Sequence, residues 1–145
     1  MKSMFVALAV TLLTGACATD ARIRDADRAA LYEAHAGAPV NSFRYTGSLN
    51  GWTPLGDGAL ALWTRPKQAY LLTFNGDCPD LDFAQAISVS SQFQTVSKNF
   101  DTVTALGSGS VVIPCRIREI RPLDVAAIKD AERQMRADAQ VSERK

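Results

Sequence analysis

The chain has 145 residues, enough for one domain with its own hydrophobic core, and its formal net charge at pH 7 is +1. Nucleic-acid-binding domains are typically strongly basic, so this near-neutral balance excludes nucleic acid as an expected partner. Hydrophobic residues make up 47% of the chain and charged residues 21%, which is the composition of a compact folded domain.

The first residues have the parts of a bacterial export signal. Lys2 supplies a positive start, and residues 4–13 contain no charged residue. A run of about ten residues is too short to span a bilayer as a helix, which needs about 20. Gly15 and Ala16 then precede Cys17, an arrangement typical of a lipoprotein cleavage site. We therefore predict a signal peptide over residues 1–16 and a lipid anchor, with acyl chains such as palmitate, on Cys17.

A plain secretory signal is the alternative, because Ala16-Cys17-Ala18 is also an A-x-A cleavage site. The lipoprotein interpretation is preferred, since it alone explains a cysteine at this position; a buried cysteine in a cytosolic protein is the least favoured interpretation. We expect a protein anchored to a membrane of the cell envelope and facing the periplasm. Ala18 favours the outer membrane over the inner one. The alternative predicts a soluble periplasmic or secreted protein.

The mature chain starts with a predicted helix over residues 22–36, which Gly37 and Pro39 terminate. Its expected apolar face is mostly alanine: Ile23, Ala26, Ala30, Leu31 and Ala34. A short strand candidate follows at residues 43–45. Residues 47–56 are rich in turn formers, and Trp52 within them is expected to plug the edge of the core.

The centre of the chain carries the clearest β-strand pattern. Two apolar runs over residues 59–64 and 69–74 flank the polar stretch Arg65-Pro66-Lys67-Gln68, which predicts a hairpin with a proline-initiated turn. Residues 83–89 are compatible with a short helix or a strand, because periodicity alone does not separate the two over so short a run.

Towards the C-terminus the pattern predicts two more strands and a helix. Residues 100–106 alternate as a strand does, and residues 111–120 form another extended stretch that Pro122 ends. Asp124 is the predicted N-cap of the last helix. The expected apolar face of that helix consists of Val125, Ile128, Ala131, Met135 and Ala139.

The two remaining cysteines, Cys78 and Cys115, are an even pair in a compartment expected to be oxidising, so they predict a disulfide. The chain has no C-x-x-C motif, which disfavours a redox pair or a zinc knuckle, and no C-x-x-C-H motif for haem. A catalytic cysteine would need a histidine, and the only one, His35, lies at the end of the first predicted helix.

No catalytic residue, metal site or cofactor is predicted. Asp77, Asp80 and Asp82 surround Cys78, but their spacing is not that of an EF-hand, and aspartates in turns usually cap them. His35 has no second histidine nearby, and the chain contains no G-x-S-x-G elbow of a hydrolase.

Four arginines form a candidate anion-binding set: Arg65, Arg116, Arg118 and Arg121. Guanidinium groups on adjacent strands bind carboxylates or phosphates in bidentate geometry. The preferred alternative is a solvated sheet edge, where charged side chains discourage strand pairing between molecules.

The ordered motifs of the chain resemble a known family. They are LWTRP at residues 62–66, AYLL at 69–72, DCP at 77–79 followed by Phe83-Ala84, and CRI at 115–117 followed by IRPLD at 120–124. These segments are similar to a family of small proteobacterial exported proteins known only as a domain of unknown function. The resemblance covers residues 43–136. It implies an exported domain with Cys78 paired to Cys115, and it implies no activity.

The sequence therefore predicts an α+β fold, with an antiparallel sheet of about five or six short strands, a helix at each end and one disulfide. We expect a lipid-anchored helix and linker over residues 17–42, a single domain over 43–140 and a polar tail over 141–145. The favoured function is a non-enzymatic module that binds an envelope protein or a small ligand. The alternatives are a structural subunit of an envelope assembly and a small, for example glycan-active, enzyme. Such an enzyme would use arginines and carboxylates drawn from Asp57, Asp77, Asp80, Asp82, Asp101 and Glu119.

Overall fold

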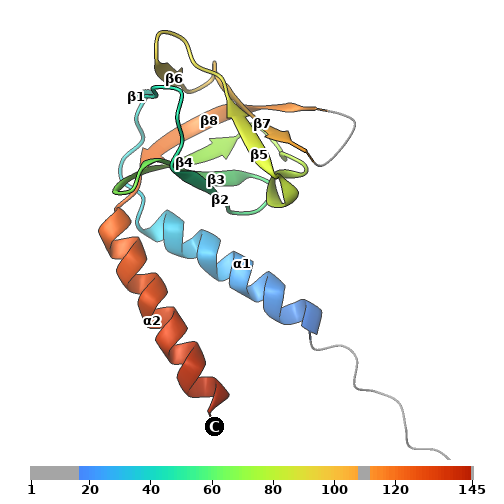
Figure 1. The fold of residues 1–145 in the computed structure, drawn as a ribbon, viewed down its shortest axis with the longest axis vertical. Helices are drawn as coiled ribbons and strands as arrows, with labels where there is room; N and C mark the ends of the chain where they lie inside the picture. The colour runs from blue at the N-terminus through green and yellow to red at the C-terminus, as the bar shows by residue number, and fades with distance from the viewer. Residues whose placement is uncertain (1–16, 108–111, 145) are drawn as a thin grey trace, which may run out of the picture.

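The computed structural model describes the backbone of residues 17–107 and 112–144, and, within these ranges, the side chains from Asp25 onward except that of Glu143. The predicted signal peptide over residues 1–16 lies outside the described residues. Figure 1 shows a curled antiparallel sheet and two helices that leave it on one side. The α+β fold, the helix near each end and the disulfide are confirmed.

The helices are α1 (Cys17–Ala34), the short 3-10 helix η1 (Leu81–Phe83) and α2 (Val125–Glu143). The strands are β1 (Ser42–Arg44), β2 (Gly51–Pro54), β3 (Ala59–Arg65), β4 (Gln68–Phe74), β5 (Ala86–Val89), β6 (Thr95–Ser97), β7 (Thr102–Leu106) and β8 (Pro114–Pro122). Six of the strands form one sheet in the order β2-β3-β4-β8-β7-β5, and β1 pairs with β6 in a separate ladder. Every pairing is antiparallel.

The interior of the curled sheet holds the main hydrophobic core. Alternate residues of β3 and β4, such as Leu60, Leu62 and Leu72, point into it and are fully buried. β8 adds Ile117 and Ile120, which both face the interior because the register shifts between them at the pairing with β4. The interior is therefore filled with side chains.

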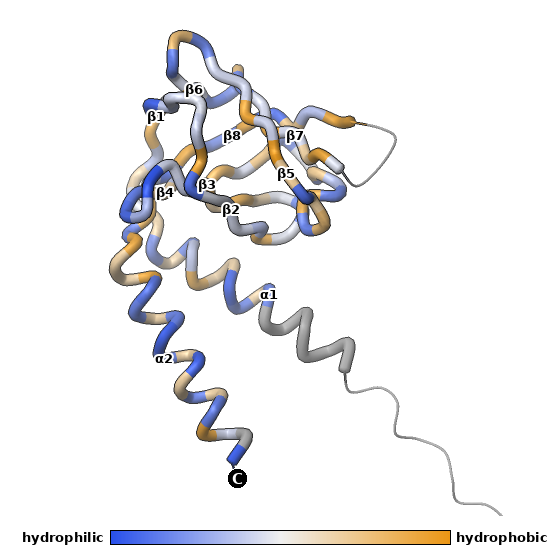
Figure 2. Tube along the Cα trace, in the orientation of Figure 1, coloured by the Kyte–Doolittle hydropathy of each residue, from blue (hydrophilic) through white to orange (hydrophobic). Residues whose placement is uncertain are grey.

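The opposite face of β3 and β4 is covered by the two helices, which form a second core. Ala61 and Ala69 of the sheet lie against Tyr32 of α1 and Ile128 of α2, all of them buried. The Tyr32 hydroxyl also donates a hydrogen bond to Glu132 of α2 over 3.1 Å. Residues 25–28 of α1 and residues 133–142 of α2 lie beyond the contact with the sheet and are exposed to solvent (Figure 2).

The helices depart from the predicted apolar faces. Ala26, Ala30 and Ala34 of α1 are exposed, while Tyr32 is buried, because its ring buries far more apolar area than an alanine does. The stripe on α2 is buried only as far as Ile128, and Met135 is 44% exposed. Asp124 caps α2 as predicted, accepting a hydrogen bond from Ala127 N over 3.1 Å. The helix continues to Glu143, through residues assigned to the polar tail.

The predicted β3–β4 hairpin is confirmed, with Arg65 paired to Gln68 across the turn. The stretch predicted as turns contains the strand β2, and the partly buried Trp52 on it packs against the core, close to the predicted role. Residues 83–89 form neither a single helix nor a single strand, since η1 ends at Phe83 and β5 starts at Ala86. In the described residues, no helix is long and apolar enough to cross a membrane.

Cys78 and Cys115 form the predicted disulfide, with Cα atoms 5.6 Å apart. Both residues are buried in the main core. The bond joins the segment after β4 to the start of β8, and β5, β6 and β7 all lie in the loop that it encloses.

We predict that replacing both cysteines with alanine lowers the free energy of unfolding by about 3–4 kcal/mol, the loop-closure value for a 37-residue separation. Urea denaturation followed by circular dichroism measures the loss. Reducing the wild-type protein under the same conditions is the control and is expected to give a similar loss. A double variant within about 0.5 kcal/mol of the oxidised wild type would contradict the prediction.

Candidate functional site

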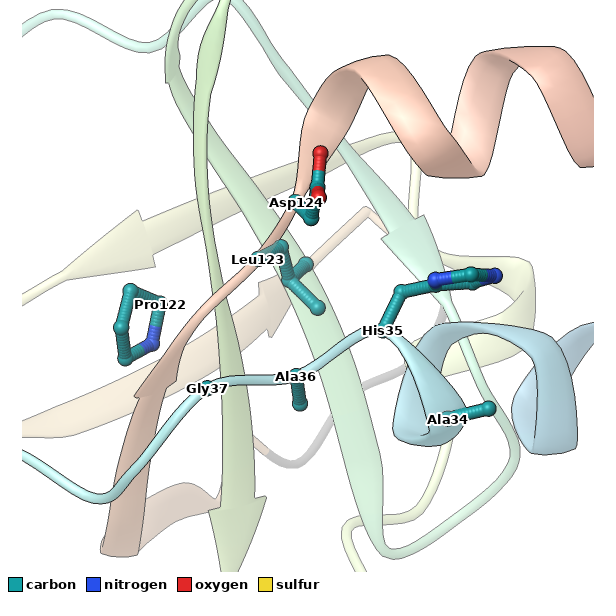
Figure 3. A pocket seen from close by; sticks show the side chains of 7 residues that line it. All are labelled: Ala34, His35, Ala36, Gly37, Pro122, Leu123 and Asp124. Carbon is teal, nitrogen blue, oxygen red and sulfur yellow. The ribbon is translucent and has the colours of Figure 1, made fainter.

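An open hollow lies where the chain leaves α1 and passes the junction of β8 and α2. It is lined by Ala34, His35, Ala36, Gly37, Pro122, Leu123 and Asp124. Figure 3 shows that the side chains of His35 and Asp124 point in different directions. The Asp124 carboxylate accepts its hydrogen bond from the first turn of α2, so it acts as a helix cap. The hollow therefore contains no acid–base pair.

The walls of the hollow are held together by hydrogen bonds within the protein. Gly37 N donates to Pro122 O over 2.7 Å, and Asp124 N donates to His35 O over 3.0 Å. The Arg121 guanidinium donates from Nε to Gly37 O over 2.8 Å and from Nη2 to Ala36 O over 2.9 Å. This network joins the end of α1 to the end of β8, so the residues that line the hollow have a structural role.

The structure brings together only part of the candidate anion-binding set. Arg116 and Arg118 lie exposed two residues apart on β8. Arg121 on the same strand instead donates hydrogen bonds to the backbone carbonyls of the two residues 36 and 37, just after the end of α1. Arg65 lies at the end of β3, which β4 separates from β8. Anion binding by these four residues stays a prediction, and so does lipid attachment at Cys17, the first residue of α1.

The carboxylates considered for catalysis fall into different environments. Partial burial raises the pKa of the Asp82 carboxyl above its ordinary value of 3.8, and the charges of Asp57 and Asp25 raise it further. Asp77 and Asp80 lie exposed in the turn beside Cys78. Among the described residues, no group of three or more His, Cys, Asp or Glu side chains is placed to hold a metal ion.

Asp101 is the buried polar residue of the core, with only 2% of its surface exposed. Its carboxylate accepts hydrogen bonds from Ser90 Oγ and from Ser97 N, each over 2.7 Å. Ser90 Oγ in turn accepts a hydrogen bond from Thr102 N over 2.9 Å. Asp101 thus fixes the segment between β5 and β7 from inside, a structural role that explains its burial.

That segment carries a large aromatic side chain in full contact with water. Phe93 is 99% exposed at the turn between β5 and β6, where Gln92 and Thr95 exchange backbone hydrogen bonds over 3.0 and 2.9 Å. Phe93 and Gln94 both have positive φ angles, of 50° and 60°. Turns of this kind favour Asn-Gly, so Phe and Gln adopt the conformation at a cost in strain.

A second exposed phenylalanine lies in the turn at the other end of β6. Phe100 is 60% exposed in the turn between β6 and β7. Only the three residues of β6 separate the two turns, a span of about 10 Å at the usual rise of a strand. We call the two residues the aromatic tip.

The aromatic tip was not predicted from the sequence. An isolated phenylalanine usually belongs to the core, and neither Asn-Gly nor Asp-Gly marks this turn. The available signal was the polar flank: Phe93 stands between Ser90-Ser91-Gln92 and Gln94-Thr95, a setting typical of an exposed turn.

The chain belongs to a family described as a family of unknown function, DUF6491, which it matches over residues 1–139. The match confirms the resemblance to a domain of unknown function that the sequence motifs indicated. No curated protein and no solved structure gives a significant match to the chain.

We predict that Asp101→Asn lowers the free energy of unfolding by about 1–3 kcal/mol. Ser90 Oγ and Ser97 N both donate hydrogen bonds to the carboxylate, and the NH₂ group of an asparagine would face one of these donors and could not accept its hydrogen bond. Thermal and urea denaturation measure the effect. Asp77→Asn makes the same charge change at an exposed position and is expected to stay within about 0.5 kcal/mol of the wild type. Equal effects of the two variants would contradict the role assigned to Asp101.

We predict that Asp82→Asn stabilises the fold at pH 7. The raised pKa means that the folded state holds the Asp82 proton more tightly than the unfolded state does. Stability from this group is therefore fully present below the unfolded pKa and is lost as pH rises through the folded pKa. The advantage of Asp82→Asn should shrink as pH falls below about 4. Urea titrations at several pH values test this, and an advantage that grows at acid pH would refute it.

Proposed function

We propose that this member of the DUF6491 family is an exported envelope protein, tethered to a membrane by a lipid on Cys17, that works by binding another macromolecule. The family match carries no activity with it, so the proposal rests on the chain itself.

The observation that carries the mode of action is the filled interior of the sheet. A curled sheet is a natural container for a small ligand, but the interior here is occupied by buried residues such as Leu62, Val103 and Ile120. Small-molecule sites are concave, largely apolar cavities that bury most of the ligand. The hollow near His35 is open and lies over backbone hydrogen bonds. These features favour binding by the outer surface of the domain.

The compartment is supported by the disulfide. Cys78 and Cys115 are buried in the core, where their bond acts as a structural crosslink. Structural disulfides form and persist in oxidising spaces such as the bacterial periplasm, and they are rare in the cytosol. The pair therefore agrees with the export signal predicted for residues 1–16.

The tether is supported by the position of Cys17. It is the first residue of α1, and an 18-residue helix is about 27 Å long. Asp25, Ala26, Asp27 and Arg28 are exposed along this helix. A lipid at Cys17 would accordingly hold the sheet away from the membrane surface, with α1 as a spacer.

We predict that Cys17→Ser releases the protein from the membrane fraction into the periplasm, or blocks its processing. Fractionation and mass spectrometry of the N-terminus test this. The wild type is expected to start at an acylated Cys17 and to sort to the outer membrane, because Ala18 follows. Ala18→Ser is the matched control and should remain anchored. An unmodified mature chain starting at Thr19 would refute the tether.

A further inference from the structure

The aromatic tip lies on a rigid part of the surface. Two backbone hydrogen bonds between Gln92 and Thr95 close the turn at Phe93, and the buried Asp101 carboxylate holds the segment behind it. Phe93 is thus presented to solvent in one backbone conformation, without the ordering cost that a flexible loop pays on binding.

The residue types at this turn are poorly suited to its backbone conformation. Positive φ angles at Phe93 and Gln94 favour Asn or Gly, and a fully exposed phenylalanine contributes no burial. Strained residues of this kind cluster at functional sites, where the strain is retained for what the side chain does. The Phe93 side chain is therefore retained for contacts with another molecule and not for the stability of the fold.

Positive charge surrounds the tip. Arg44 on β1 is paired with Thr95, two residues from Phe93, and Arg116 Nη1 donates to Asn99 O over 3.2 Å beside Phe100. Lys98 lies in the same turn as Asn99 and Phe100. None of the three cations forms an ion pair with a described residue, and residues 86–100 contain no Asp or Glu. The carboxylate of Asp101 is turned inward.

The tip lies far from the point of the proposed tether. In Figure 1 the connection between β5 and β6 lies at the top of the view, and the first residues of α1 lie on the other side of the sheet, below it. A lipid at Cys17 would therefore orient the tip away from the membrane that holds the lipid. This arrangement favours a partner in the space beyond the membrane over the bilayer itself.

We propose that Phe93 inserts into an apolar pocket of an acidic envelope protein, and that Arg44, Lys98 and Arg116 pair with carboxylates around that pocket. The choice of partner follows the proposed function, which places the domain in the envelope. Aromatic side chains and arginines dominate the binding energy of protein interfaces, and opposite charges around them provide specificity. A second copy of the chain across a twofold axis would bring like charges together, so it is a poorer fit.

Two substitutions at the turn separate binding from folding. Phe93→Asn removes the aromatic side chain, while Gln94→Gly leaves it in place, and both new residues accept a positive φ. Neither variant is expected to lower the melting temperature. A photo-crosslinking amino acid at the exposed Ser91 then reports contact in living cells, and the same group at Lys67 on the β3–β4 turn is the positional control.

We expect a discrete protein adduct from position 91 in the wild type and in Gln94→Gly, and none from position 67. Phe93→Asn should weaken the affinity of the purified partner at least about tenfold. Arg44→Glu combined with Lys98→Glu should weaken it further, and added salt should weaken the wild-type complex. The adduct should persist in Cys17→Ser cells, so failure of the tether and failure of the tip give different results.

The proposal is overturned if Phe93→Asn and Gln94→Gly crosslink alike, or if the adduct at position 91 is lipid or a second copy of this chain. A protein partner whose binding ignores the charge reversals also overturns it. Crosslinking of equal strength from position 67 would show that the contact does not depend on the tip.

Discussion

Burial of the β3–β4 hairpin on both faces is the constraint on which the rest of the fold depends. Leu60, Leu62 and Leu72 face the interior of the sheet, and each contributes roughly 1.5–3 kcal/mol by leaving water. The alternate residues Ala61 and Ala69 face the helices, and their small side chains allow close packing there. The other elements are arranged around these two faces: β1, β2, η1 and β5 to β8 contribute to the first core, and α1 and α2 to the second.

The sequence predicted the elements whose signals are local. The β3–β4 hairpin, the Asp124 cap and the cysteine pair each follow from residue types at short range or from a count, and all three are present. The strand β6 was missed because three residues give no periodicity, and its pairing with β1 is a tertiary contact. The aromatic tip was missed because an isolated phenylalanine usually belongs to the core, and only the polar residues around Phe93 indicated that it lies outside.

Two residues in one segment reverse the usual relation between polarity and burial. Asp101 carries a carboxylate into the core, and Phe93 carries a large apolar ring into water. Asp101 is stable in the core because two hydrogen bonds replace its hydration. Phe93 is kept out of the core by a turn with positive φ angles, a conformation that phenylalanine does not favour. The buried charge makes the segment rigid, and the rigid segment keeps the aromatic ring exposed.

The disulfide has a consequence for the way a protease can divide the domain. Because Cys78 and Cys115 enclose the turn at Phe93, the exposed turn is part of a covalent ring. A protease that cuts the backbone there opens the ring without releasing a fragment, and the β1–β6 ladder and the buried sulfur atoms keep both sides in register. The nicked chain would migrate as one species until it is reduced. A cut at the exposed turn thus leaves the two pieces of the protein joined.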